Sequence, residues 1–247
     1  MTEFAVFPNA PITEALLDIR VALPPEIDIK KLEFFHDRIK ERYPEKKVKG
    51  AFAVQVQVAP DGRHQSLPAL GGPHGYLFRS PSEHKIVQAR MDGFTFNKLK
   101  PYEEWKVFRD EAHQLWNVYQ EMFNPSRITR IALRYINKIE VPLPFSDFKE
   151  YILTNPEIAP KLPQSLTHFY MQLVITRPDI QATAIITQTM ENPTGNNQLP
   201  LILDIDVFRE AFYTDKDAMW ADFEKLHSFK NEIFFNSITD KTKELFK

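Results

Sequence analysis

The sequence predicts an α+β fold in which helices cover one face of an antiparallel sheet and leave the other face polar and open. Three observations predict it. Most strand-like segments alternate apolar and polar residues, two long segments carry one apolar stripe at helical spacing, and the order of segments occurs twice. Alternation with a period of two is typical of strands with one buried face, which an amphipathic helix covers. We therefore expect two β-α-β-β-β-α halves that form one sheet or two matching sheets.

The first half spans residues 12–124. Its expected elements are a strand at 12–23, a helix at 28–43, a strand at 48–58, a loop at 59–73, strands at 75–79 and 85–97, and a helix at 101–123. In the first strand Leu17 and Ile19 alternate with Asp18 and Arg20, which is period two. The last helix begins at a favourable proline, and its apolar stripe starts at Trp105 and advances by three and four residues.

The second half, residues 128–236, follows the same order. Its expected elements are a strand at 128–141, a short helix after Ser146, strands at 166–177, 180–190 and 199–208, and a long helix from Asp217. A short tail helix is expected after Ser237. Trp105 and Trp220 differ by 115 positions, and other matching points differ by 116 and 117. The offsets favour a duplicated architecture over a coincidence of alternating elements.

Composition bounds the function. The 247 residues are expected to form a single domain, with 43% hydrophobic residues to build a core. The chain has 31 Lys and Arg residues and 33 Asp and Glu residues, so it is nearly neutral. It therefore has no overall positive potential that would attract nucleic acid or an anionic membrane. Zero cysteines exclude thiol catalysis and Cys-ligated metals, and only seven glycines argue against Gly-rich phosphate loops. The start of the chain has no basic segment followed by an apolar one, so a cytoplasmic location is expected.

The residues expected on the open sheet face are the candidate binding residues. They are Arg, Asp, Glu and His side chains, which make directed hydrogen bonds and would converge if the sheet curves into a groove. The candidates are Glu14, Asp18, Arg20, Arg90, Arg130, Arg134, His168, Asp204 and Asp206. The alternative is a merely solvated sheet face, which needs no functional explanation.

Two pairs on this face carry the most specific chemistry. Asp204 and Asp206 are two residues apart on one strand, so their carboxylates lie roughly 7 Å apart, a spacing that suits a divalent cation or an acid–base pair. Arg130 and Arg134 are roughly 13 Å apart by strand rise and suit a phosphate or a carboxylate. The alternative, which the similar numbers of arginines and acids favour, is that these groups form ion pairs with one another.

The common catalytic motifs are absent from the sequence. It contains no GxxxxGK[ST], GxGxxG, GxSxG or HExxH pattern, and its seven histidines are scattered. We therefore expect no cofactor and no metal ion, and a non-enzymatic protein is favoured over an enzyme.

Four segments resemble a sporadically distributed prokaryotic protein family of about 250 residues, across essentially the whole chain. They are Asn9-Ala-Pro-Ile-Thr-Glu-Ala15, Arg130-Ile-Ala-Leu-Arg-Tyr-Ile-Asn137, Leu203-Asp-Ile-Asp206, and Leu226-His-Ser-Phe-Lys-Asn231 with Ser237-Ile-Thr239. The family, uncharacterised in activity, substrate and cofactor, assigns no catalytic residue. Its patchy distribution implies an accessory gene of the defence or toxin–antitoxin type.

The sequence as a whole predicts a non-catalytic binding protein. Its polar sheet face or its sheet edges would hold a protein partner, a second copy of the chain or a small anionic ligand. The first alternative is a phosphate- or nucleotide-handling enzyme in which Glu14, Asp204 and Asp206 hold a cation and the arginines clamp phosphate. The second is a nucleic-acid binder, which the charge balance disfavours.

Overall fold

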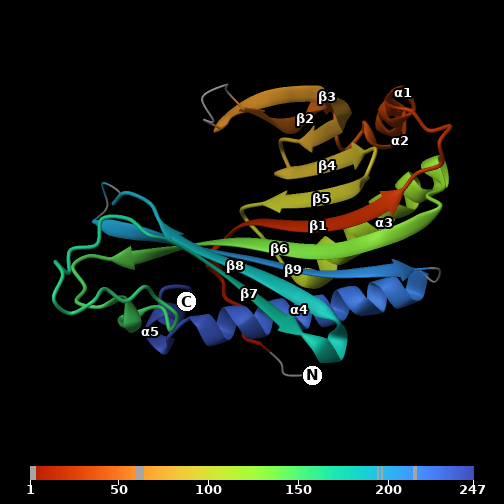
Figure 1. Cartoon of the computed structure of the whole chain (residues 1–247). Helices are drawn as coiled ribbons and strands as arrows, with labels where there is room; N and C mark the ends of the chain where they lie inside the picture. Colours follow the sequence, from red (N-terminus) through yellow and green to blue (C-terminus); the bar gives the residue numbers. More distant parts are fainter. Residues whose placement is uncertain (1–3, 59–63, 194, 196, 214–215) are drawn as a thin grey trace.

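The computed structural model describes residues 4–58, 64–193, 195, 197–213 and 216–247, and only the backbone of 51–58, 64–72 and 216. These residues form one nine-stranded antiparallel sheet with helices, so the predicted α+β class with an antiparallel sheet is confirmed (Figure 1). The strands are β1 (Ile12–Ala22), β2 (Glu45–Val58), β3 (His64–Ser80), β4 (Lys85–Arg90), β5 (Gly93–Leu99), β6 (Arg127–Pro142), β7 (Tyr170–Arg177), β8 (Ala182–Met190) and β9 (Gln198–Tyr213). The α-helices of the described chain are α1 (Ile29–Glu33), α2 (Phe35–Ile39), α3 (Trp105–Phe123), α4 (Lys216–Ser237) and α5 (Asp240–Glu244).

The strand order in the sheet is β2-β3-β4-β5-β1-β6-β9-β8-β7. The central strands β1 and β6 pair with each other. Outward from β1 the neighbours are β5, β4 and β3, and outward from β6 they are β9, β8 and β7. On both sides of the centre, the strands therefore follow one another outward in the reverse of their order along the chain. β2 is an additional strand at one edge.

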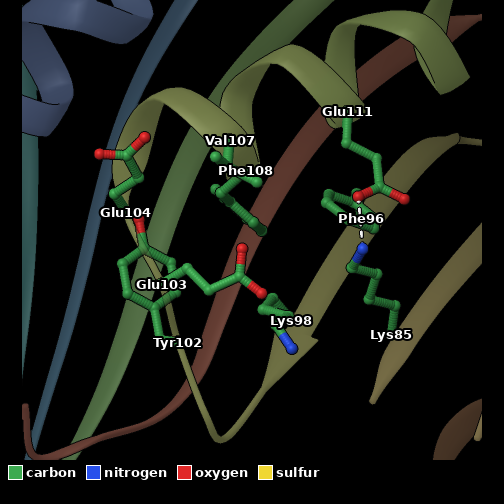
Figure 2. Close-up of a pocket in the computed structure, with 9 residues that line it drawn as sticks. All are labelled: Lys85, Phe96, Lys98, Tyr102, Glu103, Glu104, Val107, Phe108 and Glu111. Atoms are coloured by element: carbon green, nitrogen blue, oxygen red, sulfur yellow. Dashed lines mark ion pairs between the residues drawn. The ribbon is translucent and has the colours of Figure 1, made fainter. Parts of the chain in front are cut away.

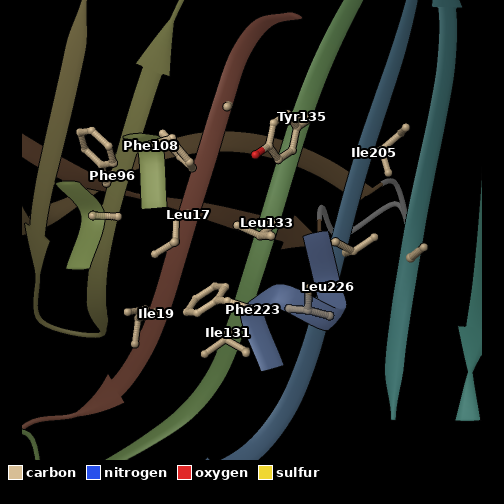
Figure 3. Packing of buried hydrophobic residues seen from close by; sticks show 14 of the residues in the cluster. Leu17, Ile19, Phe96, Phe108, Ile131, Leu133, Tyr135, Ile205, Phe223 and Leu226 are labelled. Atoms are coloured by element: carbon tan, nitrogen blue, oxygen red, sulfur yellow. The ribbon is translucent and has the colours of Figure 1, made fainter. Parts of the chain in front are cut away.

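The core lies between the sheet and the two long helices. Leu17 and Ile19 of β1 and Leu133 of β6 point toward α3 and α4, and all three are fully buried (Figure 3). Phe108 of α3 and Phe223 of α4 pack onto this face and are buried, as their apolar stripes predict.

The two indoles at the starts of the long helices lie at the border of the core. Trp105 and Trp220 are only half-buried, although apolar residues at these helical positions predict burial. Trp105 stacks on His227 with ring centroids 4.3 Å apart, and Trp220 lies 4.4 Å from His113. Each tryptophan therefore packs between α3 and α4 instead of against the sheet, and the two contacts show that both helices lie side by side.

The strand predicted at 85–97 is a hairpin, β4 and β5, and the predicted loop at 59–73 is largely strand. Gly93 has a φ of 152°, and a Cβ there would lie 2.1 Å from the Ile19 carbonyl oxygen, so glycine permits the turn. β3 begins at His64 and pairs with β2 as far as Arg79. The first half therefore has four strands after its helices instead of three. Residues 59–63 of the predicted loop lie outside the described residues.

Local helices and strand ends also differ from the prediction. The helix expected at 28–43 is divided into α1, which Asp28 caps, and α2. The short helix after Ser146 is a single 3₁₀ turn, η1 (Phe148–Glu150), and a second turn, η2 (Pro178–Ile180), precedes β8. The predicted tail helix is present as α5. None of the helices in the described ranges is long and apolar enough to cross a lipid bilayer.

Candidate functional site

The predicted candidate residues of β1, β4, β6 and β9 alternate with the buried core residues, and their charges pair with one another. Arg90 is buried, and its guanidinium donates to Asp18 at 2.7 Å and to Asp92 at 2.8 Å. The Thr95 hydroxyl donates to Asp18 at 2.8 Å. Burial raises the pKa of Asp18, but the charge and hydrogen bonds of Arg90 outweigh it and hold the pKa below its usual value.

Asp18 also lies between two arginines that face each other across β1 and β6. Arg20 and Arg130 lie directly opposite each other in the pairing of the two strands. A guanidinium nitrogen of Arg20 lies 3.2 Å from the Asp18 carboxylate and one of Arg130 lies 3.5 Å from it, so both arginines share this carboxylate. Arg20 contacts Asp92 as well. Like charges directly opposite each other destabilise a sheet, so the shared carboxylate is what allows this pairing.

Asp92 completes the cluster from the β4–β5 turn. Its carboxylate accepts from Arg90 and lies 2.9 Å from the His74 ring nitrogen. Burial raises the pKa of Asp92, but Arg90 outweighs this effect and brings the pKa down to about 2. The carboxylate is therefore ionised and fully engaged at neutral pH.

A second group of charges lies on β6 and β9. Arg134 holds Asp204 through three hydrogen bonds, from Nε to the two carboxylate oxygens at 2.9 and 3.2 Å and from Nη2 at 2.5 Å. Arg130 lies 3.7 Å from Asp206 and stacks over the Phe208 ring at 4.4 Å. Burial raises the pKa of Asp206, and the nearby arginines only partly offset this. Asp206 is therefore the least well compensated acid of the group.

These contacts follow the ion-pair alternative that the sequence left open. Arg20, Arg90, Arg130 and Arg134 each contact at least one aspartate, so none of the four presents an unpaired guanidinium. Glu14 accepts a hydrogen bond from Asn97 at 2.7 Å. Within the described ranges, no group of three or more His, Asp or Glu side chains is arranged to hold a metal ion.

The placement of His168 on a strand is wrong. β7 begins at Tyr170 instead of Leu166, and His168 lies in the exposed segment before it. Its ring makes no hydrogen bond or ion pair with any described residue. The segment has no strand partner at that point, so strand alternation does not orient its side chains.

A cavity that the sequence did not reveal lies at one end of the helical layer, with a volume of about 540 Å³. Its walls come from the N-terminal segment, from the residues that lead into α3, from β6 and from the second half of α4. Apolar side chains predominate, and the aromatic ones include Phe4, Phe7, Tyr102, Trp105, Phe234 and Phe235. The N-terminal segment is held in place because Phe4 stacks on Phe235 with centroids 5.0 Å apart, and because the Asn9 amide donates to the Phe246 carbonyl at 3.0 Å.

Lys230 carries the only unpaired buried ammonium among the side chains that line this cavity in the described chain. The residue is 6% exposed, and its Nζ lies 3.9 Å from the centre of the Tyr135 ring. Nζ donates to the side-chain oxygen of Asn231, and no described carboxylate lies within 4.0 Å of it. Burial lowers the pKa of Lys230 from 10.5 to about 7.

The groups around Lys230 are neutral and partly unsatisfied. His227 stacks flat on Trp105, and burial, helped by the nearby Lys230 charge, lowers the pKa of its ring to about 3. The Asn137 amide group donates to the Leu203 carbonyl at 3.0 Å, and its oxygen accepts no hydrogen bond from a described residue. The cavity therefore offers an amine and an amide oxygen among aromatic rings.

A sequence signal for this site was present and was missed. In α4 the apolar spacing Phe223, Leu226, Ile233 places Lys230 on the buried stripe, and in β6 the alternation Tyr135, Ile139 places Asn137 on the buried face. Polar residues at core positions are seldom fully buried without partners. Both interruptions lie in the segments on which the family resemblance rests, and both line the cavity.

Two other hollows are weaker candidates for a ligand site. The one in Figure 2, beside α3, has a volume of about 10 Å³, room for one water. Lys85 and Glu111 form an ion pair of 2.7 Å there, and Glu111 also accepts from Tyr43 at 2.6 Å, so this cluster ties β4 to the helices. A wide hollow of about 1160 Å³ along residues 143–167 is lined by no buried charged side chain.

No known protein-family model matches the chain, and no curated protein sequence matches it.

Proposed function

We propose that this chain is a binding protein whose ligand lies in the Lys230 cavity. The ligand is a compact and mostly apolar molecule that carries one hydrogen-bond acceptor, such as a carboxylate or a carbonyl group. The observation that carries the proposal is the buried Lys230 amine, which opens into a cavity and faces no carboxylate.

The energetics of the amine support a ligand. A lysine removed from water without an opposite charge destabilises the fold, or it loses its proton. Lys230 has a single hydrogen-bonded acceptor, Asn231, and the Tyr135 ring beneath it, so N–H groups remain for a ligand. An acceptor oxygen placed there satisfies them and stabilises the folded protein by linkage.

The shape and the walls of the cavity support the apolar part of the ligand. Small-molecule sites have volumes of about 300–1,000 Å³, with predominantly apolar walls and a few polar groups that fix orientation. The volume of about 540 Å³ falls in this range. The rings of Phe7, Trp105 and Phe235 offer faces for a flat or aliphatic body, and the Asn137 oxygen accepts from a ligand donor.

The experiment is a thermal-shift and calorimetry screen of the full chain against aromatic and aliphatic monocarboxylates, with benzoate and hexanoate as first probes. We expect a raised Tm and saturable binding that Lys230→Met abolishes. The matched control is Lys225→Met, on the same helix but half-exposed and paired with Asp222. Loss of binding in both variants, or equal binding in both, contradicts the proposal.

Two predictions from the sequence remain proposals beside this one. The polar sheet residues would hold a protein partner or a small anion if their ion pairs exchange for ligand contacts. The sheet edges would hold a partner strand, and the edge strand β7 has exposed apolar side chains, including Leu173, Val174 and Ile175. The phosphate-enzyme alternative has less support, because all four candidate arginines are engaged by aspartates.

We also propose that the chain is a structural duplication of 12–124 and 128–236. The symmetric strand order around β1 and β6 supports it. The interface of the long helices supports it too, because the Trp105–His227 stack has a counterpart in the contact of Trp220 with His113. The Trp and His are eight residues apart in α3 and seven in α4, about two turns in each. Superposition of the halves should align these two pairs.

A further inference from the structure

We propose that the ligand is a small aldehyde or ketone and that Lys230 captures it reversibly as an imine. This inference rests on the proposed function, because it uses the same cavity and names the ligand class. The geometry that carries it is an amine held inside an aromatic cavity with neutral neighbours.

The surroundings of Lys230 favour the free amine, which is the form that attacks a carbonyl carbon. Its Nζ donates to Asn231 and lies over the Tyr135 ring, and His227 and Asn137 line the same cavity. A carboxylate in contact would keep the nitrogen protonated, and none of the described carboxylates lies within 4.0 Å.

The other side of the cavity does not supply such a charge either. The segment before α3 contributes Tyr102, whose hydroxyl is engaged with the Tyr135 hydroxyl at 3.1 Å. Glu103 and Glu104 also line the cavity, but both are exposed and neither forms an ion pair with Lys230. Lowering of the lysine pKa to about 7 agrees with this arrangement.

The chemical step is balanced without a further reactant. The Lys230 nitrogen lone pair forms a bond to the carbonyl carbon, and the carbonyl oxygen takes up a proton to give a carbinolamine. The C–O bond then breaks, and the oxygen leaves as water with the two hydrogens that the amine began with. The product is one imine and one water, and hydrolysis returns both starting groups. Aromatic walls limit the access of water to the imine and so favour its persistence.

The test is reductive trapping on the full-length protein. The chain is incubated at pH 7 with benzaldehyde or hexanal and sodium cyanoborohydride, and intact mass and peptide mapping follow the adduct. We expect one adduct per chain at Lys230, formed roughly a hundredfold faster than at an ordinary surface lysine, because far more of this amine is neutral at pH 7. Lys225→Met should label normally, whereas Lys230→Met and Lys230→Arg should not.

Parallel binding measurements separate this inference from the proposed function. If benzoate raises the Tm through Lys230 but the aldehydes label surface lysines without preference, the imine proposal is wrong and the binding proposal stands. If the aldehydes label Lys230 selectively while carboxylates do not bind, the carbonyl class is supported. Absence of both effects overturns both proposals.

Discussion

Replacement of Lys230 by methionine tests the energetic premise on which both proposals depend. Methionine has a similar length and no charge, so the variant removes the buried amine while it keeps most of the packing against Tyr135. The wild-type residue is 6% exposed, with its Nζ 3.9 Å from the ring centre. We expect the variant to be more stable than the wild type at pH 6.

The magnitude follows from the pKa. Burial lowers the pKa of Lys230 from 10.5 to about 7, and each pH unit corresponds to about 1.4 kcal/mol, so the buried charge costs roughly 5 kcal/mol when it is present. The cation–π contact with Tyr135 and the bond to Asn231 act on the same charged form, so they belong to this difference and are not subtracted a second time. The expected stabilisation of Lys230→Met at pH 6 is therefore about 5 kcal/mol.

The pH dependence has a definite sign. Below pH 7 both the folded and the unfolded chain carry the Lys230 proton, so the full cost is present. Between about pH 7 and 10.5 the unfolded chain binds more protons at this residue, so wild-type stability rises with pH relative to the variant. The advantage of Lys230→Met should shrink steadily over this interval and vanish near pH 10.

The assay is urea unfolding of wild type, Lys230→Met and Lys225→Met at several pH values from 6 to 10. The difference in unfolding free energy between wild type and Lys230→Met is the measured quantity, because titration of all other groups cancels in it. Lys225→Met should show no comparable pH-dependent difference. A difference for Lys230→Met that stays constant from pH 6 to pH 10 refutes the description of Lys230 as a buried, unpaired amine.

Three further predictions concern the fold and the polar sheet residues. Phe108→Ala should lower the unfolding free energy by about 3–5 kcal/mol, since the ring is buried and stacks on Phe96, and a loss below about 1 kcal/mol in urea would contradict the core assignment. Gly93→Ala should cost at least about 2 kcal/mol in the same assay, because its Cβ meets a carbonyl oxygen at 2.1 Å. Arg134→Ala should cost about 1 kcal/mol, since this pair is half-exposed, while Asp206→Asn should be neutral or stabilising. If either change abolishes binding of a partner or anion without loss of stability, the polar residues are functional; unchanged binding refutes that role.

The central strands and the long helices were predictable because local patterns determine them. β1 alternates strictly, β6 does so from Leu133 onward, and α3 has a regular stripe, so short-range spacing already encodes which face is buried. β3 was not predictable in this way, because its extension through the Gly71–Pro73 turn signals depends on backbone pairing with β2. The β4–β5 hairpin was predictable in principle from Asp92-Gly93, a dipeptide typical of tight turns.

For the site, the alternation of residues along the strands predicted which face the candidate side chains occupy, but not which groups they contact. Asp18 and Asp206 were predicted on the same face as the arginines, and which carboxylate meets which guanidinium depends on strand order and register. Asp92 is not among the candidates, and the β4–β5 turn that positions it interrupts the strand predicted at 85–97. The alternation cannot predict the orientation of His168, because this residue lies before the start of β7.

The proposed duplication offers a physical reason for the position of the cavity. The two tryptophans differ by 115 positions and the two histidines by 114, so the counterpart of Lys230 in the first half is Leu115 or Trp116, both of which are buried in the core. The Trp116 ring packs at 5.9 Å against Phe94 and fills the space beneath α3. Where α3 has a buried apolar side chain, α4 therefore has an amine that lines a cavity of about 540 Å³. Complete filling of the interior stabilises a folded protein, so the cavity and the amine at Lys230 make this region less stable than a filled core would be. Local loss of stability of this kind is expected at a binding site.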